Sequence, residues 1–505
     1  MQILHFGLDF DGPVYTEKAG MRQGESYLGP VGLLHWLEGQ LGLGGYPANT
    51  DYLRIELYRQ ALGQYLETAN AAAFFARSFA ADRFATAVAL LAWRDELLLA
   101  GWDFADEPGM PPRLQSLAAV EKLFAKKIVD PSHGPLAMGV ADRLAAILGV
   151  VENRSLPEME LRLYEPINLQ KPEIQRFVQL CRLKNIPVAE IEIRCAAPAD
   201  TDLGQFQRRM LPATANPGTE KLTAGNDASL LVLRARRDSD AAVYLAQLLR
   251  LNPGLRPVFL VPEMSLNLEE NLVLEGFPAM GILSASLARP SLQVLKLAPA
   301  FLWEPVDVYK IMEFVTLPLK PLDPDLALVI ARVLAQQPGL FSDTWFAAVF
   351  GYLEQAEVAD SVRTQYGFWF ERRRYRSDAT APKRDAINIY NYLFQWARQT
   401  FDDAETKNTS LLVLAEQARR IRDLLEALPE DRLSFLDLER IVRTIYEPSP
   451  MQIGTAETGG FAFVHRPGAL AACAERVVWW NCLFENSAPS PTPTSSPSLP
   501  RTSTP

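Results

Sequence analysis

The sequence predicts an α/β fold with two lobes, each built on a parallel sheet and each interrupted by a large helical insertion. Apolar residues switch from a helical to a strand-like period near Glu160 and again near Ser229. Each switch opens a strand–helix–strand unit, which implies parallel strands. Two long stretches, at about 50–150 and 292–430, keep the helical period. A chain of 505 residues is long enough to bury more than one hydrophobic core.

The first lobe begins with an apolar, alternating stretch. Residues 3–10 are predicted to form a buried strand that ends in the turn residues Asp11-Gly12-Pro13. A helix follows, and the glycines at 42–45 are expected to close it. The apolar stripe of this helix consists of Leu33, Leu34, Trp36 and Leu37. Apolar side chains three and four residues apart between 53 and 148 then predict an inserted helical subdomain.

A strand–helix–strand unit completes the first lobe. Its strands are predicted at 159–164 and 187–193, and its helix at 172–183. Residues 196–227 are rich in Pro, Ala, Thr, Asn and Gly. This composition is typical of a linker.

The second lobe repeats the pattern. Strands are predicted at 229–233 and 257–261, with a helix at 240–251 between them. The mostly helical stretch 292–430 follows, broken by several prolines. A last helix is expected at 435–446, before two short strands at 461–464 and 476–480.

These elements divide the chain into a first lobe, a linker, a second lobe and a tail. The tail is almost entirely Pro, Ser and Thr and is expected to be disordered, because it has little apolar surface to bury. The predicted boundaries are 1–200 for the first lobe, 201–227 for the linker, 228–485 for the second lobe and 486–505 for the tail.

Composition limits the classes of function. The net charge is −10 and the pI is about 5.2, so DNA binding would have to come from local basic patches or from a partner. No run of about 18 apolar residues and no secretory signal is apparent, which predicts a cytoplasmic protein without membrane contact. Four cysteines are too few for a disulfide framework and predict free, buried thiols.

The catalytic motifs of ATPases and nucleases are absent or weak. A phosphate loop needs a Gly-Lys pair, and the sequence contains none. The one triplet of nuclease type, Glu405-Thr406-Lys407, lies in a polar run without strand character and is interpreted as a solvated loop. The four histidines are scattered without metal-binding spacing. The sequence therefore predicts no cofactor, no metal and no enzymatic activity of its own.

Asp9 and Asp11 leave one enzymatic alternative open. An apolar strand that ends in Asp-x-Asp-Gly resembles the first motif of haloacid-dehalogenase-like phosphatases. There the two carboxylates act as nucleophile and general acid and help to hold Mg²⁺. The acidic pair that this family also needs is approximated only by Asp238 and Asp240, without the family's spacing. The competing interpretation is a turn in which an aspartate caps backbone N–H groups.

Several segments, in this order, resemble inactivated superfamily-1 helicases of the AddB/RecC type. They are His5-Phe6-Gly7-Leu8, Gly29-Pro30, Gly32-Leu33-Leu34, Ser284-Ala285-Ser286, Arg289-Pro290, Leu302-Trp303-Glu304-Pro305, Ala456-Glu457-Thr458-Gly459, Arg466-Pro467-Gly468 and Val477-Val478-Trp479-Trp480. The resemblance implies two degenerate helicase-type lobes with helical insertions. It also implies a non-catalytic DNA-repair and recombination subunit that holds single-stranded DNA or supports a helicase–nuclease partner.

Such relatives often carry a PD-(D/E)XK nuclease after the segment that matches Val477-Val478-Trp479-Trp480. That part is expected to be missing here, because the sequence turns into the Pro/Ser/Thr tail within a few residues. The alternative class is a protein-interaction scaffold without DNA binding, which the acidic net charge favours.

Two arginine clusters are the candidate DNA-binding sites. Trp369, Arg372, Arg373 and Arg374 mix cations for phosphates with an aromatic ring for bases. The structural interpretation of this stretch is a helix with aromatic side chains in the core and arginines in water. Arg234, Arg236 and Arg237 follow a predicted strand, where ligands bind in open α/β sheets. The resemblance adds Ser284 and Ser286 as residues bordering a strand channel.

Overall fold

The computed structural model describes most of the chain and divides it into two compact units. The described residues are 2–16, 23–44, 46, 50–68, 73–105, 107–130, 134–210, 223, 225–261, 266–284, 290–404, 408–446, 451–452 and 455–482. The fold is mixed α/β, with 57% helix and small parallel sheets. Across the described residues, the search for a helix long and apolar enough to cross a bilayer finds none. The expected disordered tail and Glu405-Thr406-Lys407 lie outside the described residues.

Unit 1 consists of Met1–Leu43, Leu148–Ser284 and Gln452–Pro505, and unit 2 of Gly44–Ile147 and Ala285–Met451. Both sheets of the predicted lobes belong to unit 1, and most of both helical stretches belongs to unit 2. The predicted division of the chain around 201–227 stays a prediction.

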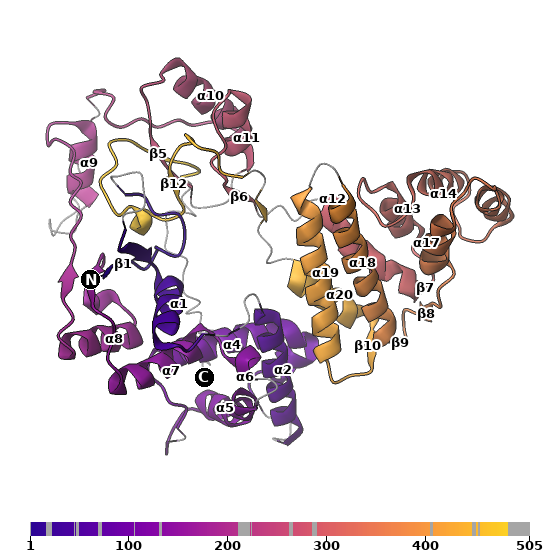
Figure 1. The fold of residues 1–505 in the computed structure, drawn as a ribbon, viewed down its shortest axis with the longest axis horizontal. Helices are drawn as coiled ribbons and strands as arrows, with labels where there is room; N and C mark the ends of the chain where they lie inside the picture. Colours follow the sequence, from indigo (N-terminus) through magenta and orange to yellow (C-terminus); the bar gives the residue numbers. More distant parts are fainter. Residues whose placement is uncertain are drawn as a thin grey trace, which may run out of the picture. The chain divides into compact units, whose positions relative to one another are not determined.

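Unit 1 contains the four-stranded and three-stranded parallel sheets and a few helices (Figure 1). Its elements are β1 (Gln2–Phe6), β2 (Glu25–Leu28), α1 (Pro30–Leu41), β3 (Met159–Leu163), η1 (Ile167–Leu169), α8 (Pro172–Leu183), β4 (Val188–Glu190), α9 (Asp202–Met210), α10 (Asp238–Leu251), β5 (Val258–Leu260), α11 (Leu266–Leu274), β6 (Leu283–Ser284), β12 (Phe463–Val464), η4 (Pro467–Ala469) and β13 (Val477–Trp479).

Unit 2 is mostly helical. Its elements are α2 (Asp51–Thr68), α3 (Ala76–Ala81), α4 (Arg83–Leu99), α5 (Pro112–Val129), α6 (Gly134–Ala137), α12 (Pro290–Leu297), η2 (Ala298–Leu302), β7 (Trp303–Glu304), α13 (Val308–Thr316), α14 (Pro324–Gln336), α15 (Asp343–Trp345), η3 (Phe346–Phe350), α16 (Gly351–Leu353), α17 (Asp360–Phe370), β8 (Tyr375–Arg376), β9 (Thr380–Pro382), α18 (Lys383–Asp403), α19 (Thr409–Ala427), β10 (Arg432–Ser434) and α20 (Phe435–Tyr446). The division between the units falls within α7 (Val140–Asn153) and β11 (Met451–Gln452).

The first sheet of unit 1 has the order β2-β1-β3-β4 and is parallel throughout. Leu4 of β1 pairs with Leu161 of β3, and both side chains are buried. Helix α8 connects β3 to β4 and begins with Pro172 in its first turn, where a proline costs no hydrogen bond. The predicted strand–helix–strand unit in this part of the chain is confirmed.

The second sheet of unit 1 has the order β12-β5-β13 and is also parallel. Val258, Phe259 and Leu260 of the central strand β5 are all buried. Helices α10 and α11 cover this sheet with apolar side chains that include Leu245 and Leu268. The predicted elements at 240–251, 257–261, 461–464 and 476–480 are present, although the strands are shorter than expected.

One predicted strand of the second lobe is wrong. Residues 229–233 form bends and irregular backbone and pair with no strand among the described residues. Leu231 is 76% exposed and Val232 is 87% exposed. A run of β-branched and aliphatic residues favours a strand only where a neighbouring strand and a buried face are available. Here the described part of the fold provides neither.

The stretch predicted as a linker begins with an ordered helix, α9. The Asp202 side chain at its start accepts hydrogen bonds from the backbone N–H groups of Gly225 (2.6 Å) and Asn226 (3.0 Å). Asp227 in turn accepts one from the backbone N–H of Asp202 at 2.9 Å. These bonds tie the two ends of the stretch together.

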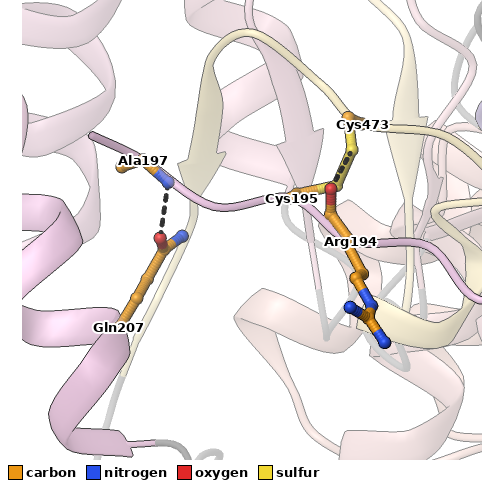
Figure 2. Close-up of a disulfide and its surroundings, with 5 residues drawn as sticks. All are labelled: Arg194, Cys195, Ala197, Gln207 and Cys473. Carbon is orange, nitrogen blue, oxygen red and sulfur yellow. Dashed lines mark hydrogen bonds between the residues drawn. A yellow bond between two sulfur atoms is a disulfide. The ribbon is translucent and has the colours of Figure 1, made fainter. Parts of the chain in front are cut away.

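A disulfide between Cys195 and Cys473 joins the two sheets of unit 1 (Figure 2). Cys195 follows β4 of the first sheet, and Cys473 lies between β12 and β13 of the second. The two residues are 278 positions apart in sequence, so nothing in their spacing indicates that they meet. The prediction that all cysteines are free and buried is therefore wrong for this pair, and Cys482 is free but exposed. Cys181 is free and buried, as predicted.

Unit 2 is built around one large apolar core. Helices α18 and α19 run side by side through it (Figure 1) and contribute buried side chains such as Ile389, Leu393 and Ile421. Tyr52 of α2 and Phe84 of α4 join the same core, so helices from both predicted insertions pack together. The helical character predicted for the two stretches is confirmed.

Candidate nucleic-acid interface

The arginine cluster of unit 2 lies in the connection between α17 and β8. Helix α17 ends at Phe370, and Glu371 forms its C-cap. Arg372, Arg373 and Arg374 follow in the short connection before β8 begins at Tyr375. The arginines therefore lie just after the last turn of α17 and are not part of the helix.

Trp369 does not reach the surface. Its side chain is 0% exposed, and its ring meets those of Phe301 and Phe314 in the core. The indole N–H donates to the carbonyl oxygen of Pro321 at 2.9 Å. This tryptophan holds α17 in place and is not available to stack on a base.

The preceding residue, Phe368, provides the aromatic surface instead. Its ring stacks on that of Tyr392 in α18, with 4.0 Å between the centroids and 18° between the planes. The guanidinium of Arg372 lies over the Phe368 ring, 4.9 Å from its centroid. The ring of Phe368 in α17 is thus in contact with both the Tyr392 ring of α18 and the guanidinium of Arg372.

Amide side chains of α18 extend this surface. Asn388, Asn391 and Gln395 are spaced by three and four residues, so they share one face of the helix with Tyr392. Asn391 accepts a hydrogen bond from Arg422 through its oxygen at 3.3 Å, which leaves its NH₂ group to donate elsewhere. Asn388 and Gln395 are exposed.

These side chains line an open depression of about 440 Å³. The lining residues are Gly367, Phe368, Arg372, Asn388, Asn391, Tyr392 and Gln395. Arg372 carries the one formal charge among them, and none is a carboxylate. The depression is therefore polar, flat on one side and weakly positive.

The guanidinium of Arg372 is partly buried, and not all of its N–H groups have a hydrogen-bond acceptor. Its Nη2 group donates to the carbonyl oxygen of Asp385 at a long 3.5 Å, while its Nε and Nη1 groups are buried without a partner among the described residues. The Asp385 carboxylate itself accepts a hydrogen bond from the Tyr375 hydroxyl at 2.6 Å. Burial lowers the pKa of Arg372 to about 10; the nearby Asp385 carboxylate acts in the opposite direction, and Arg374 adds a smaller lowering. The guanidinium remains charged at neutral pH, and its Nε and Nη1 groups lack a hydrogen-bond acceptor among the described residues.

The other two arginines of the cluster are used differently. Arg373 is exposed and lies over the Tyr375 ring at 5.3 Å. Arg374 is half-buried and donates to the carbonyl oxygen of Phe370 at 3.0 Å. Burial lowers the pKa of Arg374 as well. Arg373 is thus free to reach solvent, whereas Arg374 caps the end of α17.

The second predicted cluster belongs to unit 1. Arg234, Arg236 and Arg237 are all exposed, and no ion pair is present for them among the described residues. They follow the unpaired stretch 229–233 and not a strand end, so the sheet-edge argument for them does not hold. Arg237 is the N-cap of α10.

Ser284 and Ser286, which the resemblance to AddB/RecC-type proteins suggested, cannot be assigned to a site from the described residues. Ser284 is the last residue of β6, and Ser286 lies outside the described residues. Neither adds to a site here.

Asp11 occupies the N-terminal end of α1. Its carboxylate accepts hydrogen bonds from the backbone N–H groups of Val31 and Gly32, both at 2.8 Å, at the start of α1. Such N–H groups at a helix N-terminus attract anions. Gly29 permits the approach, because a Cβ there would lie 2.4 Å from Asp11. An internal carboxylate therefore satisfies these N–H groups.

The geometry around Asp9 does not favour the phosphatase alternative. Asp9 faces Arg466, with 3.4 Å between Oδ1 and Nη1. Gly468 lies against it, where a Cβ would meet Oδ2 at 2.4 Å. Both oxygens of Asp11 are occupied by backbone N–H groups. Over the described residues, no group of three or more His, Cys, Asp or Glu side chains is arranged to hold a metal ion.

Sequence reasoning found Arg372 but missed Phe368, Asn388, Asn391, Tyr392 and Gln395. A signal was present in α18, where amides and a tyrosine share a helical face at three- and four-residue spacing. Their meeting with α17 depends on how the two helices pack, which the sequence alone does not show.

Two comparisons with known proteins identify no relative of this chain. A scan against models of protein families finds none that matches the chain. A search of curated proteins finds no match either.

Proposed function

We propose that this protein is a non-enzymatic DNA-processing subunit that holds single-stranded DNA at the depression between α17 and α18. The observation that carries the proposal is the partly buried guanidinium of Arg372, which has two nitrogen groups without an acceptor among the described residues and lies over the ring of Phe368 in the stacked Phe368–Tyr392 pair. Proteins that bind single strands combine cations for the backbone with aromatic rings for the bases. Both groups are present here within one surface.

The chemistry of the depression suits a flat ligand with a negative charge. A base can continue the stack formed by Tyr392, Phe368 and Arg372, because every base has a π-face. A phosphate oxygen can accept from the guanidinium of Arg372 if the side chain turns toward the depression, since its Nε and Nη1 groups are buried and lack an acceptor. Arg373 adds an exposed cation beside the depression.

The rest of the chain supports a scaffold without ATPase activity. Two parallel sheets together with large helical insertions fit the resemblance to AddB/RecC-type inactivated helicases. Asp11 occupies the anion position at the start of α1, and the sequence contains no Gly-Lys pair for a phosphate loop. A subunit of this kind would hold the strand for a helicase–nuclease partner that supplies ATP hydrolysis and cleavage.

Fluorescence anisotropy with a labelled single-stranded oligonucleotide of mixed sequence tests the proposal. We expect binding that weakens between about 50 and 200 mM salt, as phosphate contacts require. Arg372→Gln should weaken binding by about tenfold, because one charge-assisted contact and its buried donors are lost. Arg332→Gln is the matched control, since Arg332 is an exposed arginine of the same unit outside the depression.

Two results would overturn the proposal. One is the absence of salt-sensitive binding to any single strand by folded protein. The other is equal affinity of the wild type, Arg372→Gln and Arg332→Gln, which would place the contact elsewhere.

A protein-interaction scaffold is the second candidate function, and the exposed stretch 229–233 favours it. Leu231 and Val232 leave apolar surface in water, and their backbone, which pairs with no strand among the described residues, can accept a strand from another chain. Val232→Asp tests this candidate, because it should abolish co-purification with a co-expressed helicase–nuclease subunit while leaving DNA binding unchanged. Co-purification that survives the substitution would contradict it.

A further inference from the structure

We infer that the segment 230–237 of unit 1 binds an acidic peptide strand of a partner protein. This inference rests on the second candidate function, the protein-interaction scaffold, and adds the chemistry of the partner. The segment begins with four exposed apolar residues, of which Val232 is 87% exposed. Arg234, Arg236 and Arg237 follow and are exposed as well. An apolar stretch that continues into a run of cations therefore faces solvent.

The segment is anchored at both of its ends. At its start, the Ser229 hydroxyl accepts a hydrogen bond from the backbone N–H of Leu203 at 3.0 Å and donates one to Asp227 at 2.6 Å. At its end, Asp238 begins α10 and accepts a hydrogen bond from the side chain of Asn481 at 3.2 Å. The exposed residues between these anchors are thus presented to solvent from two fixed points of the fold.

The backbone of the segment has hydrogen-bonding groups to offer. The N–H and C=O groups of residues 230–236 have no hydrogen-bond partner within the described part of the chain. A strand from another protein can pair with such groups, which is the main source of affinity in recognition by β-strand addition. The apolar side chains add contact area to this pairing.

The arginines define the charge of the partner. Arg234, Arg236 and Arg237 form no ion pair among the described residues, although the whole chain carries a net charge of −10. Side chains alternate between the two faces of a strand, so Arg234 and Arg236 would continue the face of Val232 once the segment is paired. Opposite charges directly across two strands stabilise the pairing. The matching strand therefore carries alternate apolar residues next to two acidic residues at the same spacing.

Two other anionic partners fit the segment less well. A bilayer cannot pair with backbone N–H and C=O groups, because its hydrocarbon region has no donors or acceptors. Single-stranded nucleic acid is usually held by aromatic rings that stack on the bases, and residues 230–237 include no aromatic residue. The aliphatic side chains and the unpaired backbone together favour a peptide.

Fluorescence anisotropy with a labelled synthetic peptide tests the inference. The glutamate peptide has the sequence Glu-Thr-Glu-Thr-Val-Thr-Val-Thr-Glu-Thr-Glu, so it can pair in either direction. Because this peptide and the whole protein are both acidic, binding requires the local cations. We expect saturable binding that weakens as the salt concentration rises. A lysine peptide, with lysine in place of every glutamate, should not bind.

Reversal of charge on the protein provides the control. In the double variant Arg234→Glu, Arg236→Glu, the glutamate peptide should bind about tenfold more weakly, because two opposite-charge pairs become like-charge pairs. The lysine peptide should bind to this variant instead. The control variant Lys171→Glu, Arg182→Glu makes the same change in net charge at exposed residues near the two ends of α8. It should bind the glutamate peptide as the wild type does.

Several results would overturn the inference. One is equal binding of the glutamate peptide by the wild type and the Arg234→Glu, Arg236→Glu variant, and another is failure of the lysine peptide to bind that variant. If neither peptide binds while Val232→Asp still abolishes co-purification, the scaffold function stands and the acidic strand is excluded. Weaker binding of that variant than of the control to a DNA single strand, or to vesicles of phosphatidylserine and phosphatidylcholine, would assign the arginines to DNA or to a membrane and contradict the inference.

Discussion

The guanidinium of Arg372 lies over the ring of Phe368, 4.9 Å from its centroid, and two of its nitrogen groups are buried without a partner among the described residues. A cation in this position is stabilised by the aromatic face but not neutralised. Burial has already removed much of the water that would otherwise solvate it, which is why the pKa of Arg372 falls to about 10. An anionic ligand that supplies the missing acceptors would remove this unfavourable contribution.

Phe368→Leu should weaken single-strand binding while preserving the fold. Leucine keeps apolar contact with Tyr392 but cannot stack, and loss of one base–aromatic contact costs about 1–2 kcal/mol of binding free energy. Anisotropy measures the change. Phe346→Leu is the control, because Phe346 is an exposed phenylalanine of unit 2 outside the depression. Equal losses in both variants would show that the effect is not specific to the stack.

Asp11→Ala should destabilise unit 1 by about 1–2 kcal/mol, the usual cost of losing a helix N-terminal cap. Helix α1 has no side-chain cap from Gly29, and Asp11 supplies it from outside the helix at 2.8 Å. Urea unfolding checks the value. Asp9→Ala should change stability by less than about 0.5 kcal/mol, because its partner Arg466 is an exposed side chain. A larger effect for Asp9 than for Asp11 would contradict these roles.

Arg94→Met should destabilise unit 2 by about 3 kcal/mol, as expected when one partner of a buried ion pair is removed. Arg94 is almost fully buried and pairs with Glu121 at 2.6 Å and Asp142 at 2.5 Å. Its loss leaves these carboxylates partly uncompensated. Urea unfolding followed by circular dichroism measures the difference, with the exposed Arg113→Met as control. A change below about 1 kcal/mol would mean that the network contributes little.

Reduction with dithiothreitol should lower the stability of unit 1 by about 2–4 kcal/mol, because the Cys195–Cys473 bond closes a very long loop. Both cysteines are exposed and accessible to the reductant. Cys195→Ser should reproduce the loss without reductant, and Cys482→Ser should not. Alkylation of four thiols in unreduced, denatured protein would contradict the bond.

Stability of unit 1 should fall as pH decreases below 6.5, in part through His5. Burial lowers the pKa of His5 from 6.5, helped by the charge of Arg162, while Glu25 and Glu160 act weakly in the opposite direction. Because the pKa of His5 is lowered in the folded state, the unfolded chain takes up the proton at a higher pH than the folded protein does. The contribution of neutral His5 to the unfolding free energy is therefore complete above pH 6.5. It is lost as the pH falls from 6.5 to the lowered pKa of His5 in the folded protein. The unfolding free energy of His5→Phe should depend less on pH between 7.5 and 5.5 than that of the wild type. Identical slopes would exclude His5 as the cause.

The helices were the most predictable part of the fold. Residues 172–183 and 435–446 form helices with the predicted bounds, because an apolar face and a clear first turn mark them locally. The stretch 229–233 failed for the opposite reason. Its strand propensity is strong, but pairing depends on distant residues that local patterns do not contain.

The candidate site was only partly predictable. Three consecutive arginines after an aromatic run drew attention to Arg372, yet the sequence favoured Trp369 over Phe368 as the stacking residue. Which of two adjacent side chains faces the core depends on the phase of α17 against its neighbours. The structure resolves this, since Trp369 packs in the core while Phe368 meets Tyr392 of α18. The Cys195–Cys473 bond was invisible for a similar reason, because it joins segments 278 residues apart.

Photo-crosslinking locates a bound single strand on the protein. A single strand that carries one 5-iodouracil is irradiated with the full-length protein, and the modified peptides are identified by mass spectrometry. We predict crosslinks to the aromatic pair Phe368 and Tyr392, which disappear when an unlabelled single strand competes. Crosslinks confined to other parts of the chain, such as the arginines at 234–237, would contradict the placement of the strand between α17 and α18.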